Sequence, residues 1–141
     1  MQKRKIPARI RSEISKRARG CCEYCYSQEQ FASHDFSVDH IIPINAGGTN
    51  ELDNLALCCQ GCNNYKHVST EMPDPETGEL SRLFNPRIDR WLDHFEWDGN
   101  FTLLKGVSPI GRVTVLRLRL NRTSLINQRI MYRAYGVHPP L

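Results

Sequence analysis

The stretch that decides the fold runs from residue 22 to residue 63. It begins with Cys22-Glu23-Tyr24-Cys25, continues through Val38-Asp39-His40-Ile41-Ile42-Pro43, Gly47-Gly48 and Asp53-Asn54-Leu55, and ends with Cys59-Gln60-Gly61-Cys62-Asn63. A Cys-x2-Cys pair presents two thiolates to one side of an ion, and two such pairs complete the ligands of tetrahedral zinc. The spacing therefore predicts a structural zinc site formed by Cys22, Cys25, Cys59 and Cys62.

The neighbouring cysteines leave a second register open. Cys21 and Cys58 adjoin the two pairs and permit a Cys-x3-Cys arrangement. We favour the Cys-x2-Cys register because it is the commoner zinc-loop spacing. Reduced cysteines in an apolar core are the alternative to any metal site, and the presence of two pairs argues against it. A unit this small buries little apolar surface, and zinc binding can supply about 10 kcal/mol of folding free energy.

Local patterns between the thiol pairs predict two strands and a helix. Residues 36–41 have strand character, and Pro43 ends this strand. Residues 45–53 contain two consecutive glycines and read as a loop, after which residues 55–58 can pair antiparallel with the first strand. Residues 60–67 then form a helix. The predicted order is strand, loop, strand, helix.

These motifs, in this order, resemble the HNH endonuclease family over roughly residues 20–68. The resemblance implies an α+β fold with a ββα-metal core held together by the four-cysteine zinc site. It implies an enzyme, a phosphodiester hydrolase that nicks or cuts DNA. The substrate that we expect is double-stranded DNA, and we expect no small-molecule cofactor.

The resemblance also assigns roles to the enclosed residues. His40 is the general base, since a neutral imidazole can take a proton from water near neutral pH. Asn54 pins the loop and orients His40. Asn63 stands where the family name expects His, and its amide oxygen favours hard cations, so Asp39 and Asn63 are expected to hold one catalytic Mg²⁺ or Mn²⁺. His67 is a further candidate ligand or phosphate contact, although a solvated surface role is favoured.

Charge is strongly segregated along the 141 residues, whose net charge is +4. Residues 1–20 carry eight Lys or Arg and one Glu, residues 21–98 carry four basic and fourteen acidic residues, and residues 99–141 carry seven basic and no acidic ones. Basic flanks around an acidic centre suit a protein that grips nucleic-acid phosphates, although they can also simply solvate helix faces. The predicted phosphate contacts lie near a helix expected at residues 7–19 and at the end of the helix at 60–67: Lys3, Arg4, Lys5, Arg9, Arg11, Lys16, Arg17 and Lys66.

The chain is predicted to comprise the nuclease core with its basic N-terminal helix over residues 1–70 and a C-terminal extension over 71–141. Residues 71–81 read as an exposed acidic turn, and Asp98-Gly99 as the centre of a hairpin over residues 95–103. Residues 113–120 fit either a strand or a helix that begins after Ser108-Pro109, and we favour the helix. This part resembles extensions of small cyanobacterial-type HNH proteins.

A last helix is expected over residues 123–135, ending at Gly136. Its apolar residues, including Ile130, would face one side, with Arg129 and Arg133 pointing outward.

The composition bears on the cellular environment in which the protein is expected to act. No stretch approaches the roughly 18 apolar residues of a membrane span. The N-terminus lacks the apolar run of a signal peptide, so the six cysteines indicate a reducing, cytoplasmic environment. Two other functions stay open: a non-catalytic, nucleic-acid-binding zinc-ribbon module and an RNA-directed nuclease.

Overall fold

A computed structural model describes residues 6–140 and divides into two compact units. The first comprises the described residues up to Thr70 together with Asn85–Arg87, and the second comprises Glu71–Phe84 together with the residues from Ile88 onward. The described residues form α-helices and separate two-stranded antiparallel sheets, which confirms the predicted α+β class. The division of the sequence into domains at residues 70 and 71 stays a prediction.

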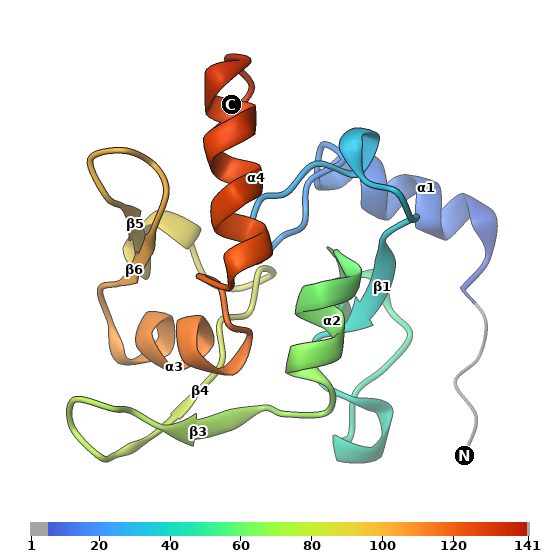
Figure 1. Ribbon diagram of the computed structural model, residues 1–141. Helices are drawn as coiled ribbons and strands as arrows, with labels where there is room; N and C mark the ends of the chain where they lie inside the picture. Colours follow the sequence, from blue (N-terminus) through green and yellow to red (C-terminus); the bar gives the residue numbers. More distant parts are fainter. Residues whose placement is uncertain (1–5, 141) are drawn as a thin grey trace. The chain divides into compact units, whose positions relative to one another are not determined.

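The first unit contains the predicted strand, loop, strand and helix (Figure 1). Its elements are α1 (Ala8–Arg17), β1 (Ser37–His40), β2 (Leu55–Cys58) and α2 (Gln60–Lys66). Strands β1 and β2 pair antiparallel, with Val38 opposite Leu57 and His40 opposite Leu55. This register confirms the expected ββα order.

Burial explains why these short elements hold together. All four residues of β2 are buried, so this strand is covered on both faces. Helix α1 has a narrow apolar stripe, and Ile14 is its fully buried residue. The Arg17 guanidinium donates to the carbonyl oxygens of Leu52 and Leu55, at 3.0 and 2.5 Å, and so ties the end of α1 to the start of β2.

The second unit is built from two hairpins and two helices. Its elements are β3 (Glu71–Pro73), β4 (Leu80–Arg82), β5 (Phe95–Trp97), β6 (Leu104–Gly106), α3 (Pro109–Arg117) and α4 (Thr123–Ala134). Ser108 caps α3 by accepting a hydrogen bond from the backbone N–H of Gly111 at 3.0 Å. This cap confirms the helix that was favoured over a strand for this segment.

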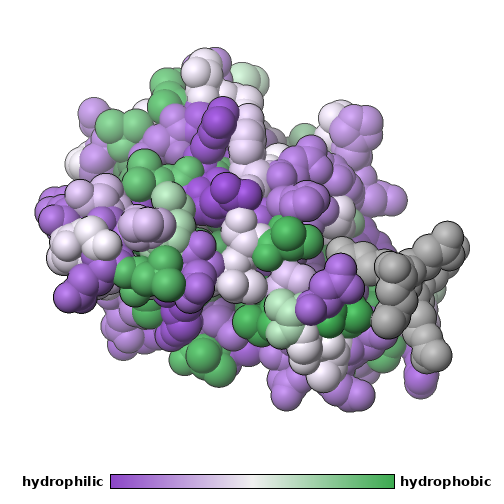
Figure 2. Space-filling view, turned by 90° about the horizontal axis from the view of Figure 1, so that it is seen from below, coloured by the Kyte–Doolittle hydropathy of each residue, from purple (hydrophilic) through white to green (hydrophobic). Residues whose placement is uncertain are grey.

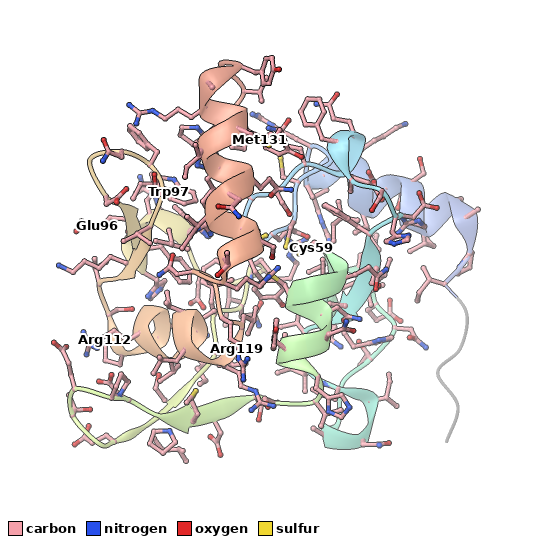
Figure 3. All side chains as sticks on the ribbon, in the orientation of Figure 1. Cys59, Glu96, Trp97, Arg112, Arg119 and Met131 are labelled. Atoms are coloured by element: carbon pink, nitrogen blue, oxygen red, sulfur yellow. The ribbon has the colours of Figure 1, made fainter. Side chains whose placement is uncertain are left out.

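The acidic segment at residues 71–81 differs from its prediction. It forms the β3–β4 hairpin, and Asp74 within it is 1% exposed. Arg112 lies on α3 (Figure 3), and its guanidinium donates to both Asp74 oxygens at 2.9 and 2.8 Å. These hydrogen bonds, above all, hold the pKa of Asp74 well below its usual range. The carboxylate is a structural anchor of the second unit.

The next hairpin has a longer connection than Asp98-Gly99 alone predicts. Phe95 pairs with Gly106 and Trp97 with Leu104, so residues 98–103 all belong to the turn. The Asp98 carboxylate accepts from the backbone N–H of Thr102 at 2.8 Å, and this bond closes the loop. The second strand therefore begins at Leu104, after the segment expected to form it.

Helix α4 buries a different face from the one predicted. Arg129 is 2% exposed, whereas Ile130 is 54% exposed. The Arg129 guanidinium donates to the carbonyl oxygens of Thr102 and Leu120 and lies over the Trp97 ring, 5.0 Å from its centroid. Backbone acceptors and an aromatic face compensate the buried charge, so this arginine replaces an apolar residue on the inner side.

Among residues 6–140, no helix has the length and apolar character needed to cross a lipid bilayer. The face drawn in Figure 2 is mainly hydrophilic, with its apolar residues in separate patches.

Candidate active site and metal centre

The two thiol pairs converge on one point. The Sγ atoms of Cys22, Cys25, Cys59 and Cys62 all lie within 4.8 Å of one another, and all four residues are buried. Cys25 Sγ and Cys59 Sγ are 3.7 Å apart. Tetrahedral zinc with sulfur at 2.3 Å separates its ligands by about 3.8 Å, so the cluster is compatible with a zinc site. Cys59 lies at the start of α2 (Figure 3).

The geometry favours the Cys-x2-Cys register. Cys21, outside the cluster, donates to the carbonyl oxygen of Arg19 at 3.6 Å, and Cys58 is a buried residue of β2. Burial raises the pKa of Cys22, whereas hydrogen bonds from the three neighbouring thiols lower the pKa of Cys59. A doubly charged cation would let all four thiols ionise together.

His40, at the end of β1, is 3% exposed. Its Nε2 lies 2.7 Å from Oδ1 of Asn50, in the loop between β1 and β2. Its Nδ1 is buried and has no hydrogen-bond partner among residues 6–140. The ring is thus hydrogen-bonded through one nitrogen, while the other has no partner in the part of the chain that the structure describes.

Asn54 pins this loop with three hydrogen bonds. Its Oδ1 accepts from the backbone N–H of Ile42 at 2.9 Å, and its Nδ2 donates to the carbonyl oxygens of Ile42 and Thr49 at 2.9 and 2.8 Å. The loop passes so close to Ile42 that position 48 must be glycine, since a Cβ there would lie 1.7 Å from the Ile42 carbonyl oxygen.

Asp39, next to His40 on β1, forms a buried ion pair. Lys66 Nζ, from the end of α2, lies 3.1 Å from Oδ2 of Asp39, and these two side chains are 1% and 4% exposed. The same ammonium donates to the carbonyl oxygens of His40 and Ile41 at 3.3 and 3.0 Å. The Tyr24 hydroxyl donates to Oδ2 of Asp39 at 2.7 Å.

The segment that holds this geometry is similar to known proteins. Residues 22–69 match the HNH endonuclease family. We call these residues the HNH region. Over 64 residues the chain is 30% identical to the type IV methyl-directed restriction enzyme EcoKMcrA of Escherichia coli (strain K12). The aligned part is 43% of this chain and 23% of that enzyme, so the chain spans less than a quarter of this curated relative. The resemblance seen in the sequence is confirmed.

Within the HNH region, two roles expected of charged residues change. Lys66 is buried and cannot contact a phosphate, because its ammonium is used by Asp39 and two carbonyl groups. The Asp39 carboxylate is used by a buried ion pair, since both of its oxygens accept hydrogen bonds, whereas the role of Asn63 as a cation ligand stays a prediction. Among the described residues, the four cysteines are the sole cluster of three or more His, Cys, Asp or Glu ligands.

The helix that carries Asn63 ends earlier than predicted. Asn63 is half-buried on α2, which stops at Lys66, and His67 follows with a positive φ of 49°. His67 is exposed and lies beyond the last helical residue. It therefore does not share a continuous helical face with Asn63, which agrees with the solvated role favoured for it.

The predicted phosphate contacts near the N-terminus separate into two groups. Arg11 pairs with Glu29 at 2.8 Å, and Arg17 bonds backbone carbonyls, so both guanidinium groups have structural partners. Arg9 and Lys16 are exposed on α1. Lys3, Arg4 and Lys5 lie outside the described residues.

Two further residues, missed by the sequence analysis, form an ion pair next to the first two cysteines. Glu23, between the first two cysteines, accepts from the backbone N–H of Leu57 at 2.8 Å and forms an ion pair with Arg87. Arg87 follows Glu23 by 64 residues in the sequence, so no local pattern indicates this ion pair. Asn50 was also missed, although its place in a glycine-containing loop near the Asp-His motif was a usable signal.

Proposed function

We propose that the HNH region hydrolyses phosphodiester bonds of DNA, with His40 as the general base. The observation that carries the proposal is the buried Nδ1 of His40, which has no partner within residues 6–140. An unpaired buried acceptor costs about 1–3 kcal/mol, and in folded proteins such an atom calls for a functional explanation. The match to the HNH endonuclease family and the nuclease relative support the same reading.

The chemistry assigned to His40 follows from its partners. Because Nε2 faces the oxygen of Asn50, the neutral ring carries its proton on Nε2 and its lone pair on Nδ1. With substrate and water in the site, Nδ1 would accept a proton from the attacking water, whose oxygen bonds to phosphorus. The bond from phosphorus to the leaving oxygen breaks, and that oxygen takes a proton from solvent. Nε2–H stays bonded to Asn50 throughout this step.

The four-cysteine cluster is proposed to hold zinc as a structural ion, because its sulfur atoms are buried and suitably spaced. Cleavage is proposed to require Mg²⁺ or Mn²⁺, which would supply positive charge at the scissile phosphate. The Asp39 carboxylate is hydrogen-bonded to Lys66 and Tyr24, so as arranged it does not fit a ligand for that ion, and Asn63 is left as the candidate ligand. No step of the reaction is assigned to them.

A plasmid cleavage assay tests the proposal. Supercoiled DNA, methylated or unmethylated, is incubated with the protein in Mg²⁺, Mn²⁺ or EDTA, and a matched RNA is run beside it. The methylated arm is included because the relative is a methyl-directed restriction enzyme. We expect cation-dependent nicking or cutting of DNA that EDTA stops.

Two histidine variants make the assay specific. His40→Ala should lower the rate by about 10²–10⁴-fold, the usual contribution of a general base. His34→Ala is the matched control, because His34 is exposed in the same unit, and it should cleave like the wild type. Wild-type turnover by His40→Ala would refute the assignment. DNA binding without cleavage would favour the zinc-ribbon module, and cleavage of RNA alone would favour the RNA-directed nuclease.

A further inference from the structure

We infer that Asn50 is the positioning residue of His40, an inference that rests on the proposed function. Asn50 is exposed in the loop between β1 and β2, yet its Oδ1 lies 2.7 Å from Nε2 of the buried His40. No other hydrogen bond to the His40 ring is formed within residues 6–140. Among these residues, Asn50 therefore supplies the one hydrogen bond that restrains rotation of the ring about its χ2 angle.

Asn50 can perform this role because Asn54 ties the loop that carries it to the chain just after β1. Asn54 Nδ2 donates to the carbonyl oxygen of Thr49, the residue directly before Asn50, at 2.8 Å. The same nitrogen donates to the carbonyl oxygen of Ile42, two residues after His40. Asn54 thus fixes the Asn50 backbone relative to the end of β1.

Glycine at position 48 makes this arrangement possible. A Cβ at Gly48 would lie 1.7 Å from the Ile42 carbonyl oxygen and 2.8 Å from Asn54 Nδ2. Any side chain there would push the loop away from β1 and carry Asn50 away from His40. Asn54, which the sequence marks as the motif asparagine, therefore acts on His40 through Thr49 and Asn50.

The contact also decides which nitrogen reacts. An amide oxygen accepts a hydrogen bond, so it favours the tautomer with the proton on Nε2 and leaves the lone pair on Nδ1. When Nδ1 takes the proton of water, the imidazolium keeps its bond to Asn50, which stabilises the charge that forms. Without Asn50 the ring can rotate, and fewer molecules present Nδ1 in the reactive orientation.

Kinetics of three variants test the inference. Asn50→Ala removes the acceptor, Asn50→Asp keeps an oxygen near the same place, and Asn45→Ala is a control at another exposed asparagine of the loop. Asn50→Ala should lower kcat by about 10- to 100-fold, by analogy with residues that orient metal-binding histidines. KM and the melting temperature should not change. Asn50→Asp should recover most of the lost kcat, and Asn45→Ala should match the wild type.

A spectroscopic readout separates positioning from catalysis. With ¹⁵N-labelled histidine, NMR should show a protected Nε2–H proton on the neutral His40 ring of the wild type and of Asn45→Ala. In Asn50→Ala this proton should exchange rapidly with water, and its signal should broaden or vanish.

The possible failures are distinguishable. An Asn50→Ala variant with wild-type kcat, or with an unchanged Nε2–H signal, overturns the role of Asn50 and leaves the proposed function standing. A wild-type protein that cleaves no substrate, while its Nε2–H proton is protected as expected, overturns the proposed function and the catalytic meaning of the contact together.

Discussion

Replacing Lys66 by methionine should destabilise the first unit strongly. Methionine keeps most of the side-chain volume but removes the ammonium that binds Asp39 and the carbonyl groups of His40 and Ile41. Lys66 and Asp39 are 1% and 4% exposed, so the carboxylate would remain buried without its counter-charge. Breaking a buried ion pair on one side typically costs about 3–5 kcal/mol. The Tyr24 hydroxyl still donates to Asp39, so we expect a value near 3 kcal/mol.

Hydrogen exchange measures this loss where it occurs. Both tryptophans, Trp91 and Trp97, lie in the second unit, so their fluorescence does not report on the first one. The backbone amides of the paired strands β1 and β2 report on the first unit. A decrease of about 3 kcal/mol in its free energy of unfolding should speed their hydrogen exchange by about 10²-fold. Combining Lys66→Met with Asp39→Asn removes both charges and should restore most of the protection. Protection within tenfold of the wild type in Lys66→Met, or no recovery in the double variant, would refute this reasoning.

Three further results are expected. Cys62→Ser should lose zinc, as measured by elemental analysis, and should destabilise the HNH region. The reason is that zinc can supply about 10 kcal/mol of folding free energy. Undiminished zinc in this variant would exclude a four-thiol site. Because Arg112 lowers the pKa of Asp74, the carboxylate stabilises the second unit above about pH 4, and this contribution is lost as the pH falls toward the lowered pKa. Asp74→Asn should therefore be less stable at pH 7 and lose less on acidification, as followed by tryptophan fluorescence in urea; parallel losses would contradict this. Replacing Arg9 or Lys16 by alanine should lower the slope of log affinity for DNA against log salt by about 0.9 for each phosphate contact removed, as followed by fluorescence anisotropy. An unchanged slope would leave α1 without a role in DNA binding.

Much of the candidate site could be predicted from local pattern. The spacing of Cys22, Cys25, Cys59 and Cys62 indicated one cluster, and the structure brings their sulfur atoms together. Asn54 was expected to pin the loop, and it does so through Ile42 and Thr49. Short spacings carry this information because loop and strand geometry over a few residues fixes where such side chains point.

The charged residues were less predictable. Lys66 and Arg129 read as exposed basic residues on amphipathic helices, and Asp74 as part of a solvated acidic turn. All three are buried, because each meets a partner that neutralises or hydrogen-bonds it. Burying a charge is costly without such partners, so a sequence pattern that does not reveal them assigns the residue to the surface.

The sequence by itself determined the thiol cluster, the ββα order and the family to which residues 22–69 are matched. Only the tertiary structure decided that Asp39 is paired with Lys66, 27 residues away, and that Asn50 holds His40. The physical reason is the range of the interactions. Turn, strand and thiol-pair geometry are set by neighbours in the chain, whereas the partner of a buried charge or a histidine nitrogen is set by which elements pack together.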